Sequence, residues 1–220
     1  FGGSVNFTNF VALYVRDDSI DIDEGYVKYR SDWRPGPAPD AAAVRLLDSW
    51  RRKLYAAGLV GHYPDLGVGF GNISIRAPRA GEFIISGTQT GHLAETGGEH
   101  YALVTEADID GNRIVCHGPV QASSEAMTHA AIYALSERIN AVVHVHSRPL
   151  WDTLRDKLPT TRAEVAYGTP EMAREFGRLW RETPFRNDGV AVMAGHDEGL
   201  ISFGESLPEA ARRVLELSAD

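Results

Sequence analysis

Three histidines and one carboxylate are the side chains of this sequence best suited to chemistry. His144 and His146 close the apolar run 141–143, which predicts a short buried strand. Residues i and i+2 of a strand point to the same side, so both imidazoles should leave it in one direction. His196 ends a second apolar run, and Glu125 stands at the expected start of a helix. Such groups at the ends of elements can surround one divalent cation and leave room for a substrate.

Each of these residues also has an ordinary structural interpretation. A pair such as His144 and His146 often lies on a surface or fills a structural role, so the pair alone is weak evidence of a metal. Glu125 on its own would be an acid in the first turn of a helix. The histidines make a role for Glu125 beside a cation the favoured alternative. The helix dipole and a neighbouring cation should both lower its pKa.

Composition limits the class of protein. A chain of 220 residues with 43% hydrophobic and 24% charged residues fits one globular domain. No apolar run approaches the ~20 residues that span a bilayer, and the first residues lack the basic segment of a signal peptide. The net charge of −8 and the absence of a basic run argue against nucleic acid as a partner. The single cysteine, Cys116, excludes an internal disulfide and predicts a reducing, cytoplasmic location.

The chain divides near residue 39. Residues 1–39 carry an acidic patch and end in a proline-rich run that cannot be helical, so we expect an N-terminal extended arm with strand-like parts. Residues 40–220 should form one domain. Within it, apolar spacing and capping signals predict a helix that starts near Asp40 and stops at Gly58 or Gly61, and further helices at 124–137, 149–154, 170–181 and 208–218. Strands are expected at 73–75, 83–85, 101–105, 113–116, 140–146, 162–166, 189–195 and 200–203.

Four motifs in this order resemble the class II aldolase/adducin family. They are Gly71-Asn72-Ile73-Ser74-Ile75-Arg76, Ser123-Ser124-Glu125 with His129, His144-Val145-His146-Ser147, and His196. The similarity runs from about residue 40 to the C-terminus and leaves the arm outside. It implies an α/β fold, a three-layer αβα sandwich around a mostly antiparallel central sheet. It also implies a homo-oligomer, a tetramer, with active sites near the subunit interfaces.

The resemblance also implies roles for particular residues. His144, His146 and His196 would bind one divalent metal ion per subunit, zinc first, with manganese, cobalt or nickel as alternatives. Glu125 would be the acid/base, and His129 a buried residue behind it. The substrate would be a small hydroxy-carbonyl compound, a sugar or sugar phosphate, cleaved by retro-aldol chemistry through a metal-stabilised enediolate. Its phosphate would be held by Asn72, Thr90, Gly91, Ser123 and Ser124. The alternative role of Ser123 is to cap the helix, and that of Thr90 and Gly91 is to form a turn.

Two departures from the family pattern leave the reaction open. The loop 86–92 is longer than in the related aldolases and adds His92. The segment 159–163 has no tyrosine where those enzymes use one on the leaving aldehyde, and Tyr167 lies further along the chain. The same metal site could therefore serve an epimerase, a dehydratase or a decarboxylase. A non-catalytic, adducin-like interaction module is the alternative from another class.

Overall fold

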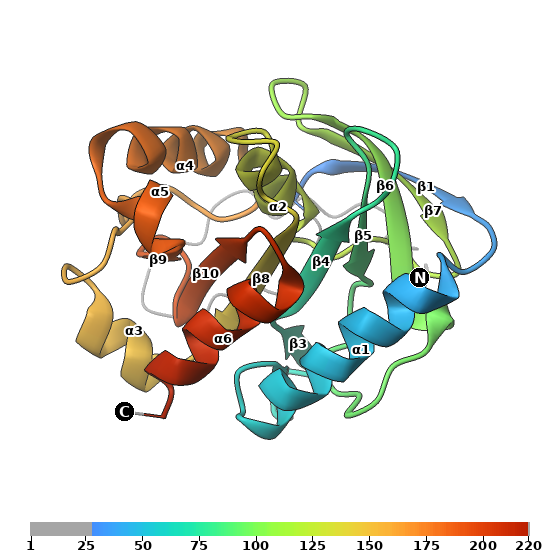
Figure 1. The fold of residues 1–220 in the computed structure, drawn as a ribbon, viewed down its shortest axis with the longest axis horizontal. Helices are drawn as coiled ribbons and strands as arrows, with labels where there is room; N and C mark the ends of the chain where they lie inside the picture. Colours follow the sequence, from blue (N-terminus) through green and yellow to red (C-terminus); the bar gives the residue numbers. More distant parts are fainter. Residues whose placement is uncertain (1–27, 220) are drawn as a thin grey trace, which may run out of the picture.

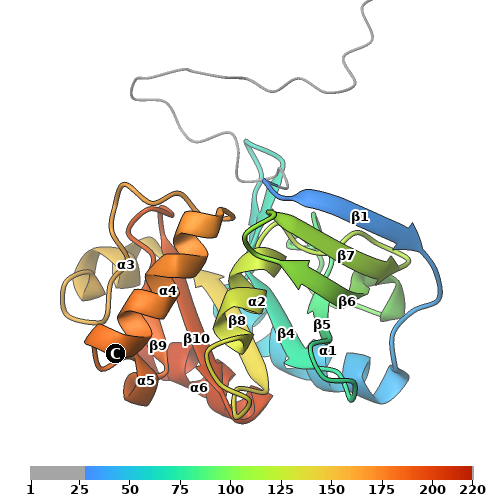
Figure 2. The ribbon, with the colours of Figure 1, turned by 90° about the horizontal axis from the view of Figure 1, so that it is seen from above.

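The computed structural model describes residues 28–219, so most of the predicted arm lies outside the described residues. The described part of the arm includes the first strand, β1 (Arg30–Pro35). This strand pairs in parallel with β7 (Arg113–Gly118) at one edge of the sheet, a position visible in Figure 2. Residues 30–35 are thus part of the same sheet as the domain that follows.

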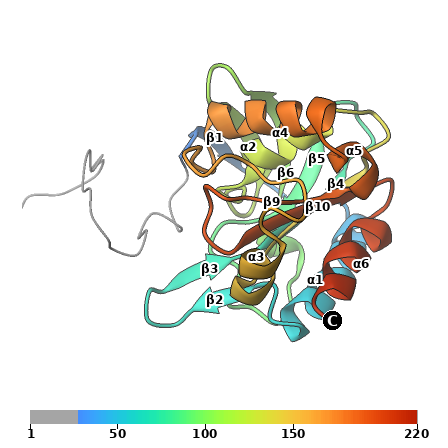
Figure 3. The same ribbon diagram turned by 90° about the vertical axis from the view of Figure 1, so that its left-hand side faces the viewer.

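A central sheet of eight strands organises this part of the chain, in the order β1-β7-β6-β5-β4-β8-β10-β9. Every pairing except β1–β7 is antiparallel, as predicted. The remaining bounds are β4 (Asn72–Arg76), β5 (Phe83–Ser86), β6 (Tyr101–Asp108), β8 (Ala141–His146), β9 (Val190–Val192) and β10 (Gly199–Gly204). A separate hairpin of β2 (Gly61–Tyr63) and β3 (Val68–Phe70) projects beside the sheet (Figure 3).

Helices cover both faces of the sheet and confirm the three-layer sandwich (Figure 1). One face packs against α1 (Ala41–Ala56) and α6 (Leu207–Leu217), and the other against α2 (Ala126–Tyr133) and α4 (Pro170–Glu182). The short helices α3 (Arg148–Leu154) and α5 (Phe185–Asp188), and the 3₁₀ turn at Gly98–His100, lie in connections. Alternation along β8 divides the core, because Val142 faces the α2 side while Val143 faces the α1 side.

Local chemistry explains where the helices begin. The Asp40 carboxylate accepts hydrogen bonds from the N–H groups of Ala42 and Ala43, each at 2.9 Å, so α1 starts directly after the proline-rich run. Thr169 and Ser206 cap α4 and α6 in the same way, with a proline in each first turn. Helix α2 is shorter than the predicted 124–137. Its C-terminal carbonyl, on Tyr133, accepts a 2.7 Å hydrogen bond from the Arg76 guanidinium instead of continuing the helix.

The predicted strand at 162–166 is wrong. The Arg162 N–H donates to the Glu175 carboxylate at 3.0 Å, and the Val165 N–H donates to the Arg162 carbonyl at 3.2 Å. These bonds replace ladder partners, so the segment is a turn. The segment predicted as a strand at 189–195 is also shorter, since β9 ends at Val192. Among the described residues, no helix has both the length and the apolar character to cross a membrane.

Candidate metal centre

The two histidines of β8 point to the same face of the sheet, as the strand period requires. That face is the one covered by α2 and α4, the side on which Val142 packs. His196 lies in the turn between β9 and β10 and joins them because β10 pairs with β8, with Ile201 opposite His144. The Nε2 atom of His144 lies 3.1 Å from that of His146 and 3.2 Å from that of His196. The third separation, His146 to His196, is also 3.2 Å.

The hydrogen bonds made by the Nδ1 atoms of His144 and His146 determine whether their Nε2 atoms carry a proton or a lone pair. His144 donates its Nδ1–H to the Leu200 carbonyl at 3.0 Å. The Tyr63 hydroxyl donates to the Glu198 carboxylate at 2.5 Å, so its oxygen is left to accept from the Nδ1–H of His146 at 3.2 Å. With each proton on Nδ1, the Nε2 atoms of both residues present lone pairs. Two lone pairs cannot hydrogen-bond to each other at 3.1 Å.

A cation between the three imidazoles resolves this repulsion. Nitrogens bound at about 2.0–2.1 Å to a tetrahedral zinc lie about 3.3–3.4 Å apart, close to the separations seen here. Burial lowers the pKa of His144 to about 4 and those of His146 and His196 well below the usual range, so all three imidazoles are neutral near pH 7. The donor set therefore fits a divalent cation such as zinc, and three ligands leave a position for a substrate.

The third histidine, His196, is held in place by aromatic rings and by glycine backbone. The Tyr167 ring stacks on His196, with 4.0 Å between centroids and 25° between planes. A Cβ at Gly199 would lie 2.9 Å from the His196 ring, and one at Gly195 would lie within bonding distance of the Val165 carbonyl. Only glycine fits both positions, which is how the turn brings His196 back to β8.

Glu125 lies at the start of α2 and is fully buried. Neither carboxylate oxygen has a hydrogen-bond partner among the described residues. Burial raises its pKa to about 7, and the nearby Thr128 hydroxyl and Lys28 ammonium offset this only in part. The lowering of this pKa that we expected from the helix dipole is outweighed by desolvation, and the further lowering by a neighbouring cation stays a prediction. A carboxyl group that titrates near neutral pH is suited to take up and return a proton.

His129 lies one turn further along α2 and is fully buried, as predicted. Its Nδ1 is 2.7 Å from the Ser74 hydroxyl, which also contacts the Tyr133 hydroxyl at 2.7 Å. This network ties α2, whose N-cap residue is Glu125, to β4.

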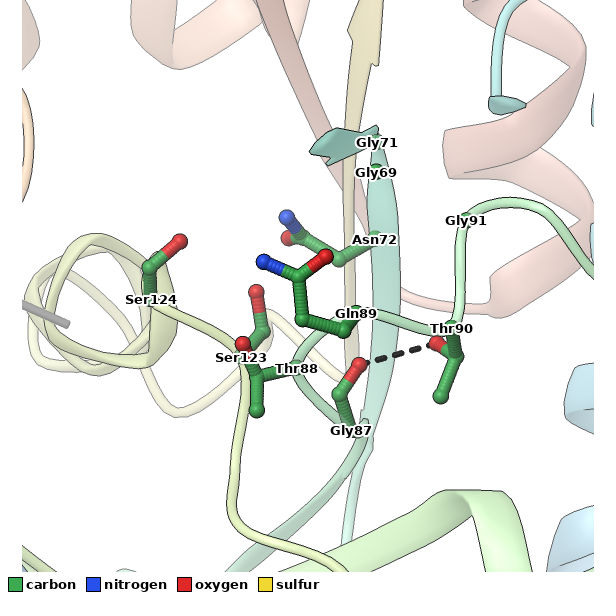
Figure 4. Close-up of a pocket in the computed structure, with 10 residues that line it drawn as sticks. All are labelled: Gly69, Gly71, Asn72, Gly87, Thr88, Gln89, Thr90, Gly91, Ser123 and Ser124. Atoms are coloured by element: carbon green, nitrogen blue, oxygen red, sulfur yellow. Dashed lines mark hydrogen bonds between the residues drawn. The ribbon is translucent and has the colours of Figure 1, made fainter. Parts of the chain in front are cut away.

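A small polar pocket lies beside the three histidines and collects all five residues that the sequence assigned to phosphate. Asn72, next to His144 in the β4–β8 register, forms one wall. The loop 87–91 forms the second wall, and Ser123 and Ser124 form the third (Figure 4). The Asn72 amide oxygen is buried without a partner among the described residues. The lining contains hydroxyls, amides and glycine backbone but no charged side chain.

Two of these five residues, Thr90 and Ser123, also make hydrogen bonds that stabilise the local backbone. The Thr90 hydroxyl donates to the Gly87 carbonyl at 2.8 Å, and the Ser123 hydroxyl accepts from the Glu125 N–H at 3.3 Å. The turn and capping roles weighed for them are therefore present. Ser124 and Asn72 remain the side chains best placed to meet a ligand.

Buried Arg51 fixes the shape of the loop. Its guanidinium donates to the carbonyls of Leu93, Thr90 and Gly91 at 2.5, 2.7 and 3.4 Å. Gly91 packs so closely on β2 that an added Cβ would overlap the Gly61 carbonyl. The loop is thus pressed against the β2–β3 hairpin, beside the histidines.

Sequence reasoning missed several residues around the centre. Tyr63, Phe70 and Glu198 contact His146 directly or through one hydrogen bond, the Phe70 ring stacking on His146 at 5.3 Å. None of the three belongs to a recognisable motif. The sequence pattern assigns no role to Tyr167, because it lies beyond the segment 159–163. The turn at 162–166 nevertheless precedes it, and the Tyr167 ring stacks on His196.

Two sequence comparisons find known proteins that are similar to this chain. The family model described as Class II Aldolase and Adducin N-terminal domain matches residues 50–219. The chain is 28% identical over 157 residues to L-fuculose phosphate aldolase of Methanocaldococcus jannaschii, covering 66% of this chain and 77% of that protein.

Solved structures share the fold. L-fuculose-1-phosphate aldolase from Thermus thermophilus superposes with a TM-score of 0.60 at 21% identity, covering 82% of this chain and 91% of that one. YgbL from Klebsiella pneumoniae, provisionally described as an aldolase/epimerase/decarboxylase, superposes with a TM-score of 0.60 at 19% sequence identity. The match covers 81% of this chain and 86% of that one. A sugar-phosphate aldolase from Thermotoga maritima superposes with a TM-score of 0.60 at 17% sequence identity, and the match covers 81% of this chain and 91% of that one.

Proposed function

Because the chain belongs to the class II aldolase/adducin family, we propose that it is a metal-dependent lyase that cleaves a hydroxy-carbonyl substrate by retro-aldol chemistry. The observation that carries the proposal is the convergence of three Nε2 atoms within 3.2 Å of one another, two of them with fixed lone pairs. Neutral imidazoles in this arrangement favour a divalent cation, with zinc first and manganese, cobalt or nickel as alternatives.

His144, His146 and His196 would hold the cation, one per subunit. When bound, it would supply Lewis-acid stabilisation of the negative charge that develops on the carbonyl oxygen and its neighbour. The hydrogen bonds of His144 to Leu200 and of His146 to Tyr63 keep both rings in the tautomer that a cation requires.

Glu125 would carry the proton. It is the carboxyl group buried beside the centre, and its raised pKa lets it accept a proton from a substrate hydroxyl and return it to the carbon left by cleavage. The pocket beside it would hold the other end of the substrate. Asn72, Thr90, Gly91, Ser123 and Ser124 supply hydroxyls, an amide and backbone N–H groups suited to a phosphate.

Other reactions on the same site are distinguished by their products. Cleavage releases two carbonyl fragments, whereas epimerisation keeps the mass, dehydration loses water and decarboxylation releases CO₂. The missing tyrosine at 159–163 keeps epimerase, dehydratase and decarboxylase as alternatives. The adducin-like, non-catalytic alternative is disfavoured because the ligand histidines and the buried glutamate are all retained. A homo-oligomer, a tetramer by family resemblance, is part of the proposal.

Metal analysis of the purified protein tests the centre. We expect about one zinc, manganese, cobalt or nickel per chain in the wild type and in the control His62→Ala, whose side chain is exposed on β2. His144→Ala and His196→Ala should lose the metal. A wild type without stoichiometric metal would overturn the proposal.

The reaction is tested by screening ketose 1-phosphates and unphosphorylated 2-keto-4-hydroxy acids for aldehyde release. For the best substrate, Glu125→Gln should keep the metal and lower kcat by about 10²–10⁴. A Glu125→Gln variant as fast as the wild type would remove Glu125 from the mechanism, and products other than two carbonyl fragments would replace the retro-aldol reaction with one of the alternatives.

A further inference from the structure

Lys28 is a candidate substrate-binding residue that comes from outside the region matched by the family model. That model covers residues 50–219, whereas Lys28 lies just before β1. Its Nζ lies 3.6 Å from the centroid of the Tyr167 ring. A segment from the N-terminal side of the chain therefore places a cation at the wall of the metal centre.

The Lys28 backbone is fixed by its neighbours. The Tyr29 ring is buried, and its hydroxyl donates to the Ser123 carbonyl at 2.8 Å, two residues before Glu125. The Lys28 carbonyl accepts a 3.2 Å hydrogen bond from the Asn112 side chain. The lysine is thus anchored to the segment that carries the proposed catalytic carboxylate.

One aromatic ring separates Lys28 from a metal ligand. The Lys28 ammonium and the His196 ring lie 3.6 and 4.0 Å from the centroid of the Tyr167 ring. Two groups so close to the centre of one ring must occupy opposite faces. The Lys28 ammonium is therefore separated from the proposed ligand His196 by the thickness of one aromatic ring.

Among the residues that the structure describes, the Lys28 ammonium has no anionic partner. Within residues 28–219 no carboxylate lies within ion-pair distance of Lys28 Nζ, although the side chain is half-buried. Glu125 is close enough for its pKa to respond to Lys28, yet neither of its oxygens accepts a hydrogen bond from it. A partly desolvated ammonium without a counter-ion gains most from an anion that enters with a ligand.

The sheet topology indicates which end of a substrate would face Lys28. The polar pocket lies on the β4 side of β8, where Asn72 pairs with His144. His196 and Tyr167 lie on the other side, towards β10. A substrate that reaches from the pocket to the metal centre would turn its other end towards Tyr167 and Lys28.

We propose that Lys28 binds a carboxylate carried by the substrate next to its metal-chelating carbonyl, and so selects hydroxy-keto acids over neutral hydroxy-ketones. This inference rests on the proposed function, and in particular on the metal centre. Lys28, which lies before the matched region 50–219, would then contribute a side chain that determines specificity.

Two small probes that differ in one group test the proposal. 3-Hydroxypyruvate and hydroxyacetone share the chelating carbonyl and hydroxyl, but the first has a carboxylate where the second has a methyl. Their dissociation constants for the zinc-loaded full chain would be measured by calorimetry. The wild type should prefer hydroxypyruvate, and Lys28→Met should reduce that preference about tenfold or more, since a hydrogen bond to a charged group is lost.

Two further variants distinguish the effect of the positive charge at position 28 from a general effect of the substitution on the fold. Lys28→Arg keeps the positive charge and should retain most of the preference, whereas the control Arg30→Met removes an exposed cation two residues away and should leave it unchanged. A Lys28→Met protein that binds both probes as the wild type does would overturn this inference alone. A wild type that retains no zinc would overturn the proposed function, and this inference with it.

Discussion

The buried carboxyl group of Glu125 should make the metal-free protein less stable as pH rises. Its folded-state pKa is about 7, against an ordinary value of 4.5. Below about pH 4.5 the group is protonated in both the folded and the unfolded chain and has no effect on stability. Above that pH the unfolded chain releases the proton while the folded chain retains it, so the free energy of unfolding falls until the pH passes the folded pKa.

The size of this effect follows from the shift. A rise of pKa from 4.5 to about 7 corresponds to about 3 kcal/mol once the group is ionised in both states. Glutamine has nearly the same shape and no charge. Glu125→Gln should therefore stabilise the metal-free protein by about 3 kcal/mol at about pH 8 and by less than about 1 kcal/mol at about pH 5.

Urea unfolding of protein stripped with a chelator measures the difference at both pH values. The matched control is Glu216→Gln, an exposed glutamate on α6, which should change the free energy of unfolding by less than about 0.5 kcal/mol. Equal effects of Glu125→Gln at both pH values, or a loss of stability at about pH 8, would refute the claim that Glu125 is a desolvated, unpaired acid. The variant should gain stability while it loses activity, a trade-off expected of a catalytic group.

Two further outcomes follow from contacts around the centre. Tyr63→Phe removes the oxygen that accepts from His146 Nδ1–H and should weaken zinc binding by about 10–100-fold in a chelator competition, whereas Tyr55→Phe, at a surface tyrosine, should not; equal zinc affinity in both variants would remove the tautomer argument. Gly91→Ala places a Cβ against the Gly61 carbonyl and should lower the free energy of unfolding by about 1–3 kcal/mol in urea; an unchanged unfolding midpoint would show that the loop does not press on the hairpin as described.

The layered fold was largely predictable because its signals are local. The Asp40 cap with its proline-rich approach, and the Thr169 and Ser206 caps with first-turn prolines, specify helix starts without tertiary contacts. The failed strand at 162–166 shows the limit of such signals. Its backbone hydrogen bond goes to the side chain of Glu175, which is distant in sequence, and no period in the chain reveals that partner.

The chemistry of the site divides in the same way. A strand period of two was enough to place His144 and His146 on one face, and their order with His196 and Glu125 was enough to suggest a metal centre. The protonation of these groups was not predictable. Helix-start position alone predicted a lowered pKa for Glu125, while burial, a property of the whole core, raises it to about 7.

By itself the sequence determined the residue types, their order and their local periods: a histidine pair on a strand, an acid at a helix start and hydroxyls before it. Only the tertiary structure decided that β10 carries His196 to β8, that Tyr63 fixes a tautomer, and that Lys28 reaches Tyr167 from the far edge of the sheet. Distances between segments remote in sequence, and the exclusion of water from them, are set by the packing of the whole chain. The pKa values, and with them the chemistry, depend on those two quantities.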